Sequence, residues 1–256
     1  MWTGALSFGL VNIPVRLYSA AGENDLKFKF LRKSDLSPIK YMKIARKDGK
    51  EVPFTEIVRG YEYKKGDFIV LSDDDFKKAN VKRTKTIDIT QFADESDIDL
   101  IYAERPYYLE PDKGAAKPYA LLREALRRSK RVGVAEFVLR NKQHLGIIKP
   151  TGNVIVLEQL RYNEEVRKPV GLDVPAAKAD QKELKMALNL IDQLTAHFDP
   201  ARHKDAYRKE LTQLIGKKAR GKKVAPKGKA PEPTDVTDLM KMLRKSLDKG
   251  RKKTTA

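Results

Sequence analysis

The alternation of apolar residues in the first eighteen positions is the strongest constraint on how this chain can fold. Apolar residues occupy even positions from 6 to 10 and odd positions from 11 to 17. Because side chains alternate with a period of two along a strand, this change of phase requires a bulge or bend between Leu10 and Pro14. Pro14 cannot donate to a ladder, and Gly4 and Gly9 suit kinks. The segment predicts a strand that bends as at a barrel corner, with a Pro-interrupted edge strand as the alternative.

Further short segments alternate in the same way between turn residues: 26–30, 39–46, 86–92, 98–103, 107–110, 132–140, 145–149 and 154–160. Many short strands separated by turn signals predict a barrel or a sandwich. Asp48-Gly49 after the second of these segments predicts a hairpin turn. The resulting hairpin is rich in lysine, so we expect it to project toward something anionic, although an ordinary exposed hairpin has the same composition.

Two helices are predicted within this part of the chain. One begins at Ser72, where Ser72 and Asp75 have the spacing of a capping box, which explains the acidic run better than a metal or catalytic cluster does. The other covers 117–130, with Tyr119, Leu122 and Leu126 on its buried face.

The apolar period changes to 3.6 after residue 178. One predicted helix places Leu184, Leu188, Ile191, Leu194 and Phe198 on one face, and a second covers 201–215 and is ended by Gly216. Residues 216–233 are rich in Lys, Gly, Ala and Pro and predict a flexible linker. A short amphipathic helix is predicted at 235–248, and its candidate partner-binding residues are Leu239, Met240, Leu243 and Leu247. This helix could instead pack on its own domain.

The charge of the chain favours an anionic partner. The formal net charge is +18, and residues 216–256 hold 14 Lys or Arg against 4 Asp or Glu, a net of +10, which leaves +8 for residues 1–215. Two separately basic regions favour nucleic acid over a solvated surface. A membrane partner is disfavoured, because no basic segment carries an amphipathic aromatic face and no apolar run is long enough to span a bilayer.

Several blocks of sequence closely resemble one family. They are residues 2–20 (WTGALSFGLVNIPVRLYSA), 104–114 (ERPYYLEPDKG), 117–126 (KPYALLREAL) and 157–162 (LEQLRY). In this order they resemble the bacterial Ku proteins, the DNA-end-binding homodimers of non-homologous end joining, over residues 2 to about 215. The resemblance implies a mixed, mainly β fold: a Ku-type β-barrel core with a protruding basic arch, a short α-helical C-terminal region and a basic tail. The implied domains are 1–177, 178–215 and 216–256.

The resemblance also implies a function. Two copies would form a closed ring that threads onto a duplex end, and the chain would bind DNA ends without sequence specificity, protect or bridge them, and recruit DNA ligase D. The sequence contains no helix-turn-helix, zinc-finger or basic-zipper pattern, which agrees with contacts to phosphates alone. The candidate DNA-binding residues, chosen by charge and location, are Lys27, Lys29, Lys40, Lys43, Arg46, Lys47, Lys50, Lys82, Arg83, Lys85, Arg123, Arg127, Arg128, Lys130, Arg131, Lys217, Lys218, Arg220, Lys222 and Lys223.

No catalytic residue, metal or cofactor is expected. Cysteine is absent, and His197 and His203 lack the spacing of a helical metal pair. The lack of cysteine and of a secretory signal pattern fits a reducing cytoplasm. The DNA binding that the resemblance implies would make the protein nucleoid-associated there. Two other functions stay open from sequence. The chain could be a non-specific nucleoid or nucleic-acid-binding protein, or a DNA-acting enzyme with a lysine lyase activity, which needs only one activated lysine.

Overall fold

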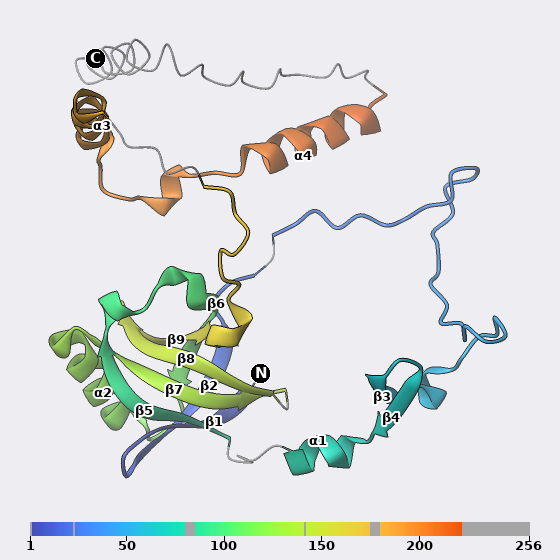
Figure 1. Ribbon diagram of the computed structural model, residues 1–256, viewed down its shortest axis with the longest axis horizontal. Helices are drawn as coiled ribbons and strands as arrows, with labels where there is room; N and C mark the ends of the chain where they lie inside the picture. Colours follow the sequence, from blue (N-terminus) through green and yellow to red (C-terminus); the bar gives the residue numbers. More distant parts are fainter. Residues whose placement is uncertain (1, 23, 80–84, 141, 175–179, 222–256) are drawn as a thin grey trace. The chain divides into compact units, whose positions relative to one another are not determined.

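A computed structural model describes residues 2–22, 24–79, 85–140, 142–174 and 180–221 (Figure 1). The contacts divide the chain into two compact units, Met1–Pro169 and Val170–Ala256. The candidate linker at 222–233 and the predicted helix at 235–248, with Leu239, Met240, Leu243 and Leu247, lie outside the described residues.

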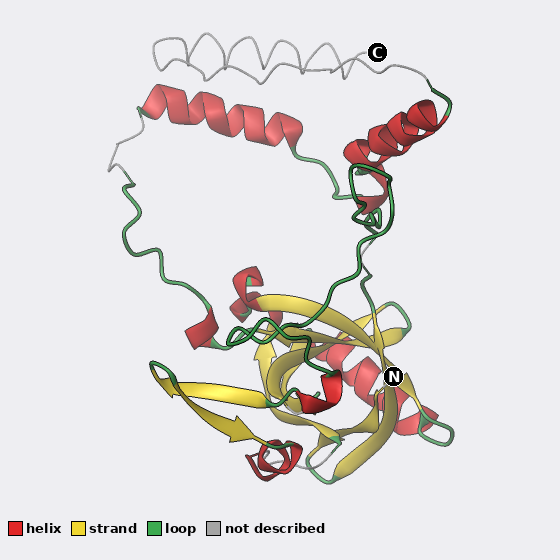
Figure 2. Cartoon of the chain, turned by 90° about the vertical axis from the view of Figure 1, so that its right-hand side faces the viewer, coloured by secondary structure: helices red, strands yellow, loops and turns green. Residues whose placement is uncertain are grey.

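The first unit contains a closed barrel of seven strands (Figures 1 and 2). They are β1 (Trp2–Phe8), β2 (Val11–Ser19), β5 (Thr86–Asp94), β6 (Ala103–Pro111), β7 (Arg131–Leu139), β8 (Lys142–Thr151) and β9 (Val154–Leu160). Their order around the barrel is β1-β2-β6-β9-β8-β7-β5. The pair that closes the barrel, β1 with β5, is parallel, and every other pair is antiparallel. The prediction of a mainly β, barrel-type fold is confirmed.

The opening segment forms two strands and not one bent strand. β1 and β2 are joined by a two-residue turn, in which Gly9 has φ +58° and Leu10 is fully exposed. A positive φ at the first turn position favours glycine and matches the strand twist of a two-residue hairpin. The change of apolar phase therefore marks a hairpin, and the predicted bulge is wrong. Pro14 lies in β2 opposite Ala5, where it is accommodated without a break in register.

The apolar core fills the barrel and extends to helix α2 (Ala116–Ser129). Its fully buried side chains come from six strands and include Leu6, Ile13, Ile87, Leu109, Ile148, Ile155 and Leu157. On α2, Tyr119, Leu122 and Leu126 are buried in the same cluster, as the helical period predicts. A second cluster of Val132, Ile147 and Leu160 packs against Ile98 and Tyr102.

Tyr119 joins α2 to two strands of the barrel. Its hydroxyl donates to the Leu109 carbonyl of β6 at 2.6 Å and accepts from the Ile155 amide of β9 at 2.7 Å. Burial raises the pKa of Tyr119, so the phenol keeps its proton at neutral pH and can make both bonds. The side chain therefore fixes the helix at the end of the barrel formed by the end of β6 and the start of β9.

Several predicted elements between the strands differ from the structure. Residues 98–103 do not form a strand: a 3₁₀ turn, η3 (Leu100–Tyr102), is capped by the Asp99 carboxylate. The other 3₁₀ turns are η1 (Phe54–Glu56), η2 (Glu95–Asp97), η4 (Asn163–Glu165) and η5 (Pro200–Arg202). The capping box at α1 (Asp73–Ala79) is confirmed, since Ser72 and Asp75 each bond the other's backbone amide.

The second unit contains helices α3 (Gln181–Leu194) and α4 (Ala206–Ala219). α3 ends before Phe198, so this residue is not on the predicted stripe. α4 begins later than predicted because the Asp205 carboxylate caps it, and it continues through Gly216 to Ala219, two residues before the positive-φ Gly221. An interior glycine costs only about 1 kcal/mol relative to alanine, so a helix can pass through it.

Replacing Tyr119 with Phe removes both hydroxyl bonds and leaves the buried Ile155 amide without this partner. An unsatisfied buried donor costs about 1–3 kcal/mol, so we expect Tyr119→Phe to lower the free energy of unfolding by that amount in a denaturant titration. Tyr207→Phe is the control, because Tyr207 is exposed and its hydroxyl has no partner among the described residues. Equal stability of the two variants would show that Tyr119 does not link helix and barrel.

Candidate nucleic-acid interface

Residues 24–71, all of which the structure describes, contain no buried side chain. We call them the extended segment. They include the two-stranded β3 (Arg59–Lys64) and β4 (Asp67–Leu71), which pair only with each other. Large apolar side chains are nevertheless frequent and exposed, among them Phe28, Phe30, Leu36, Tyr41, Met42, Ile44, Phe54, Val58, Tyr61, Phe68, Ile69 and Val70. So many large apolar side chains left in water by a single copy are typical of a segment that meets a partner.

The same segment concentrates positive charge. Between positions 27 and 50 there are nine Lys or Arg and two Asp, a net charge of +7. Lys43 lies over the Phe54 ring, 4.6 Å from its centroid, and Arg32 pairs with Asp35. Within the part of the chain that the structure describes, the side chains of the other predicted contact residues have no partner: Lys27, Lys29, Lys40, Arg46, Lys47 and Lys50. They are therefore available to phosphates.

The extended segment contains two similar turns, and Arg46, Lys47 and Lys50 lie on the second. One is closed by the bridge between Leu31 and Pro38, and the other by the bridge between Ile44 and Glu51. Each has a residue of positive φ at its sixth position, Leu36 at +59° and Gly49 at +71°. The Asp48-Gly49 turn is confirmed, but the strands predicted at 26–30 and 39–46 do not form, because a single bridge is the only pairing in each place.

Each turn is also held by an aspartate that accepts from the amide two residues later. Asp35 accepts from the Ser37 amide at 3.1 Å, and Asp48 accepts from the Lys50 amide at 3.2 Å. Asp35 in addition accepts two bonds from the Arg32 guanidinium, at 2.9 and 2.5 Å. The Arg32 bonds, and then those from Ser37, lower the pKa of Asp35 to about 2.

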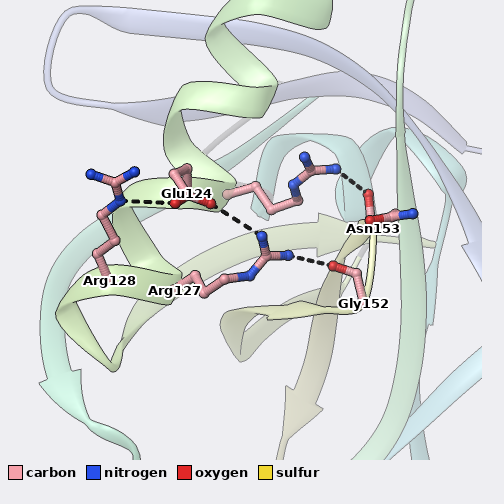
Figure 3. A network of polar contacts seen from close by, with 6 residues as sticks. Glu124, Arg127, Arg128, Gly152 and Asn153 are labelled. Atoms are coloured by element: carbon pink, nitrogen blue, oxygen red, sulfur yellow. Dashed lines mark hydrogen bonds and ion pairs between the residues drawn. The ribbon is translucent and has the colours of Figure 1, made fainter.

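The arginines of α2 support the barrel instead of standing free (Figure 3). Arg123 donates to the Asn153 carbonyl and Arg127 to the Gly152 carbonyl, both at 2.5 Å, and so they hold the turn between β8 and β9. Glu124 accepts from Arg127 at 3.1 Å and from Arg128 at 2.8 Å. These contacts explain Arg123 and Arg127 as residues that stabilise the barrel, which the composition of the sequence alone could not show.

The remaining candidates are divided between paired, unpaired and undescribed positions. Arg131 pairs with Asp94 at 3.4 Å, and Lys130 is the left-handed C-cap of α2. The Arg220 side chain bonds the Gly216 carbonyl at 3.0 Å. Lys85, Lys217 and Lys218 have no side-chain partner among the described residues. Lys82, Arg83, Lys222 and Lys223 lie outside them.

Two further findings concern the classes of site considered from sequence. In the described ranges, no three His, Asp or Glu side chains are grouped so that they could hold a metal ion. None of the described helices is long and apolar enough to cross a membrane.

The exposed apolar side chains of the extended segment are the feature of the candidate interface that its lysine content does not predict. A signal was present: between positions 28 and 70 aromatic and aliphatic residues are frequent without a sustained period of 2 or 3.6. Such a composition indicates apolar surface with no place in the chain's own core.

The barrel agrees with a comparison to known families. A family model described as "Ku70/Ku80 beta-barrel domain" matches residues 7–186. The chain belongs to the Ku family. It is 44% identical over 254 residues to "Non-homologous end joining protein Ku" of Opitutus terrae, which covers 97% of this chain and 91% of that protein. Proteins of the same name from Bacillus subtilis and Pseudomonas aeruginosa are 41% and 38% identical, covering 98% and 100% of this chain and 82% and 93% of theirs.

In this Ku chain, the Arg32–Asp35 pair makes the stability of the turn at 31–38 depend on pH. Because the pKa of Asp35 is lower in the folded chain than its ordinary value of 3.8, the pair stabilises the turn fully above about pH 3.8. This stabilisation is lost as the pH falls through about 2. We expect a carboxyl NMR titration to give Asp35 a pKa near 2, and Arg32→Gln to move it toward 3.8. Arg59→Gln, which removes a pair with Asp73 instead, leaves Asp35 unchanged. An Asp35 pKa near 3.8 in the unaltered chain would contradict this geometry.

Proposed function

We propose that this chain binds double-stranded DNA ends as a ring-shaped homodimer in non-homologous end joining. The names of relatives that match nearly the whole chain support the process. The observation that carries the proposal is the extended segment, which is basic, rich in exposed apolar side chains and buried nowhere in a single copy. Its two kinds of side chain need two kinds of partner.

A second copy of the chain is the proposed partner of the apolar side chains. An isolated two-stranded hairpin is marginally stable in water, and β3 and β4 expose apolar residues on both faces. Tyr61 lies opposite Ile69 on one face, and Phe68 and Val70 lie on the other. Pairing of two such segments would remove this surface from water and give the segment a defined shape.

DNA phosphates are the proposed partners of the cations. Of the unpaired cations of the extended segment, Arg46, Lys47 and Lys50 lie on a turn, and none lies on a helix that could enter a groove. Contacts of this kind are sequence-independent and weaken with salt. We retain Lys27, Lys29, Lys40, Arg46, Lys47 and Lys50 as the primary contacts, and rank Arg123 and Arg127 below them because they hold the barrel turn.

A closed ring would convert these unspecific contacts into recognition of ends, because a ring can load onto a duplex only where the duplex stops. The ring would protect or bridge ends in the cytoplasm, at the nucleoid. No catalytic step is part of the proposal.

We further propose that α3 contributes to the recruitment of DNA ligase D. Leu184, Leu188 and Ile191 recur on one face of α3 and are exposed. A helix of 14 residues is marginal alone, and an amphipathic face of this kind docks in apolar grooves. Ligation stimulated equally with and without Leu188→Asp would contradict this role.

End dependence distinguishes a ring from a nucleoid-type protein. We expect the chain without residues 222–256, which keeps α4 and removes most of the basic tail, to bind linear duplex and to bind closed circles of the same sequence poorly. It should also fail to bind linear DNA blocked by bulky adducts at both ends, yet stay bound when ends are blocked after loading. Gel-shift titrations measure binding to each of these DNA substrates. Equal affinity for circle and line would exclude the ring.

The salt dependence of DNA binding tests the assignment of contacts. If Lys47 and Lys50 each neutralise one phosphate, Lys47→Gln/Lys50→Gln makes the slope of log K against log salt shallower by about 1.8 per protomer, at about 0.9 per contact. The charge-matched control is Lys113→Gln/Lys117→Gln, whose side chains have no partner among the described residues. An equal change in both double variants would mean that net charge, not position, sets the slope.

A further inference from the structure

The two ends of the barrel interior differ in chemistry. Residues directly opposite one another on paired strands share a face, so the inward rows can be followed from one end to the other. At the end covered by α2 these rows hold Leu109, Ile148 and Ile155, all buried. At the opposite end the same rows hold polar residues.

The polar end follows from the registers of the strands. Along β9 the inward row continues from Leu157 to Gln159, and Arg105 of β6 lies opposite Gln159. His144 of β8 lies opposite Phe137 and stacks on its ring at 5.4 Å. Gln159 is the only buried polar residue in the described part of the chain, with 7% of its surface exposed.

These residues surround a cavity of about 350 Å³ at the mouth of the barrel. Its lining consists of Glu104, Arg105, Tyr107, Leu139, Arg140, Lys142, His144 and Gln159. Mouths of β-barrels are common sites for small ligands, and this volume falls in the range of small-molecule pockets.

The charges at the mouth favour an anion. The lining holds three permanent cations and one carboxylate, a net charge of +2, which falls to +1 when Glu165, the partner of Lys142, is counted. Glu104 already accepts from the Gln159 amide at 2.8 Å, and Lys142 is paired with Glu165 at 3.3 Å. Arg105 and Arg140 have no hydrogen bond or ion pair within the part of the chain that the structure describes. Two guanidinium groups at one cavity repel each other, and a bound dianion would relieve this repulsion while accepting paired N–H donors.

We propose that the barrel mouth binds a small phosphomonoester of about the size of a nucleoside monophosphate. Arg105 and Arg140 hold the phosphate, and Tyr107, Leu139 and His144 contact the remainder of the molecule. A bare phosphate ion would leave most of the cavity unfilled. The site does not depend on the ring or on the extended segment, since every lining residue belongs to the barrel strands or to the β7–β8 turn.

Titration with dAMP tests the proposal on the full chain. We expect dAMP to bind and to shift the NMR resonances of Gln159 and His144, whereas deoxyadenosine, which lacks the phosphate, binds at least about tenfold more weakly. Inorganic phosphate should also bind more weakly than dAMP. The absence of dAMP binding at millimolar concentration, or equal binding of deoxyadenosine, would overturn the proposal.

Substitution of the two arginines locates the site. Arg105→Gln/Arg140→Gln should weaken dAMP binding at least about tenfold, and Lys113→Gln/Lys117→Gln, with the same change of charge, should leave it unaltered. If the double variant does not fold, Arg105→Gln and Arg140→Gln are tested separately, since both side chains are exposed.

A 5′-phosphorylated oligonucleotide that binds more tightly than dAMP, with the same arginine dependence, would support the site and show that its phosphate comes from a DNA end. Equal weakening by the control variant would overturn the proposal. DNA-end binding that fails while these results hold would reject the proposed function alone.

Discussion

Burial is divided unequally along this chain, and the rest of the structure depends on that division. The barrel strands and α2 bury a continuous core, whereas residues 24–71 bury nothing although they carry many large apolar side chains. Hydrophobic burial is the main favourable term in folding, so a segment without it cannot hold a defined shape by itself. The barrel is accordingly a scaffold that is complete in one copy, and we propose that the extended segment gains its order from a partner.

This division also separates two kinds of cation. On α2 the Arg123 and Arg127 guanidinium groups donate to carbonyls of the β8–β9 turn, where they fix the barrel. The turns of the extended segment are held by aspartates and by backbone bonds, and the side chains of its unpaired lysines take part in none of these bonds. Positive charge that has no structural task is free to bind phosphates, which is the physical reason for proposing the DNA interface there.

Much of the barrel could be predicted from sequence because its strands have a clear period of two and are bounded by turn residues. The β9 bounds and the buried face of α2 were predicted correctly for this reason. The opening hairpin was mistaken for a bulge because a change of apolar phase fits both, and only the φ of Gly9 separates them. The Asp99 carboxylate caps a 3₁₀ turn where the apolar pattern predicts a strand, and the Asp205 carboxylate caps α4 later than the apolar pattern predicts. At the candidate interface, the sequence identifies the candidate cations. It does not show which of them are paired, because pairing depends on residues distant in the sequence, such as the carbonyls of Gly152 and Asn153.

The central claim is that a second copy covers the extended segment, and sedimentation equilibrium tests it most directly. The unaltered chain should sediment as a dimer at micromolar concentration, and Ile69→Asp/Val70→Asp, which places a charge on each face of the β3–β4 hairpin, should shift it to a monomer. Leu10→Asp/Leu121→Asp adds the same charge at exposed apolar sites of the barrel unit and should leave the dimer intact. A monomer at all concentrations, or a dimer that is unaffected by the hairpin substitutions, would contradict the claim.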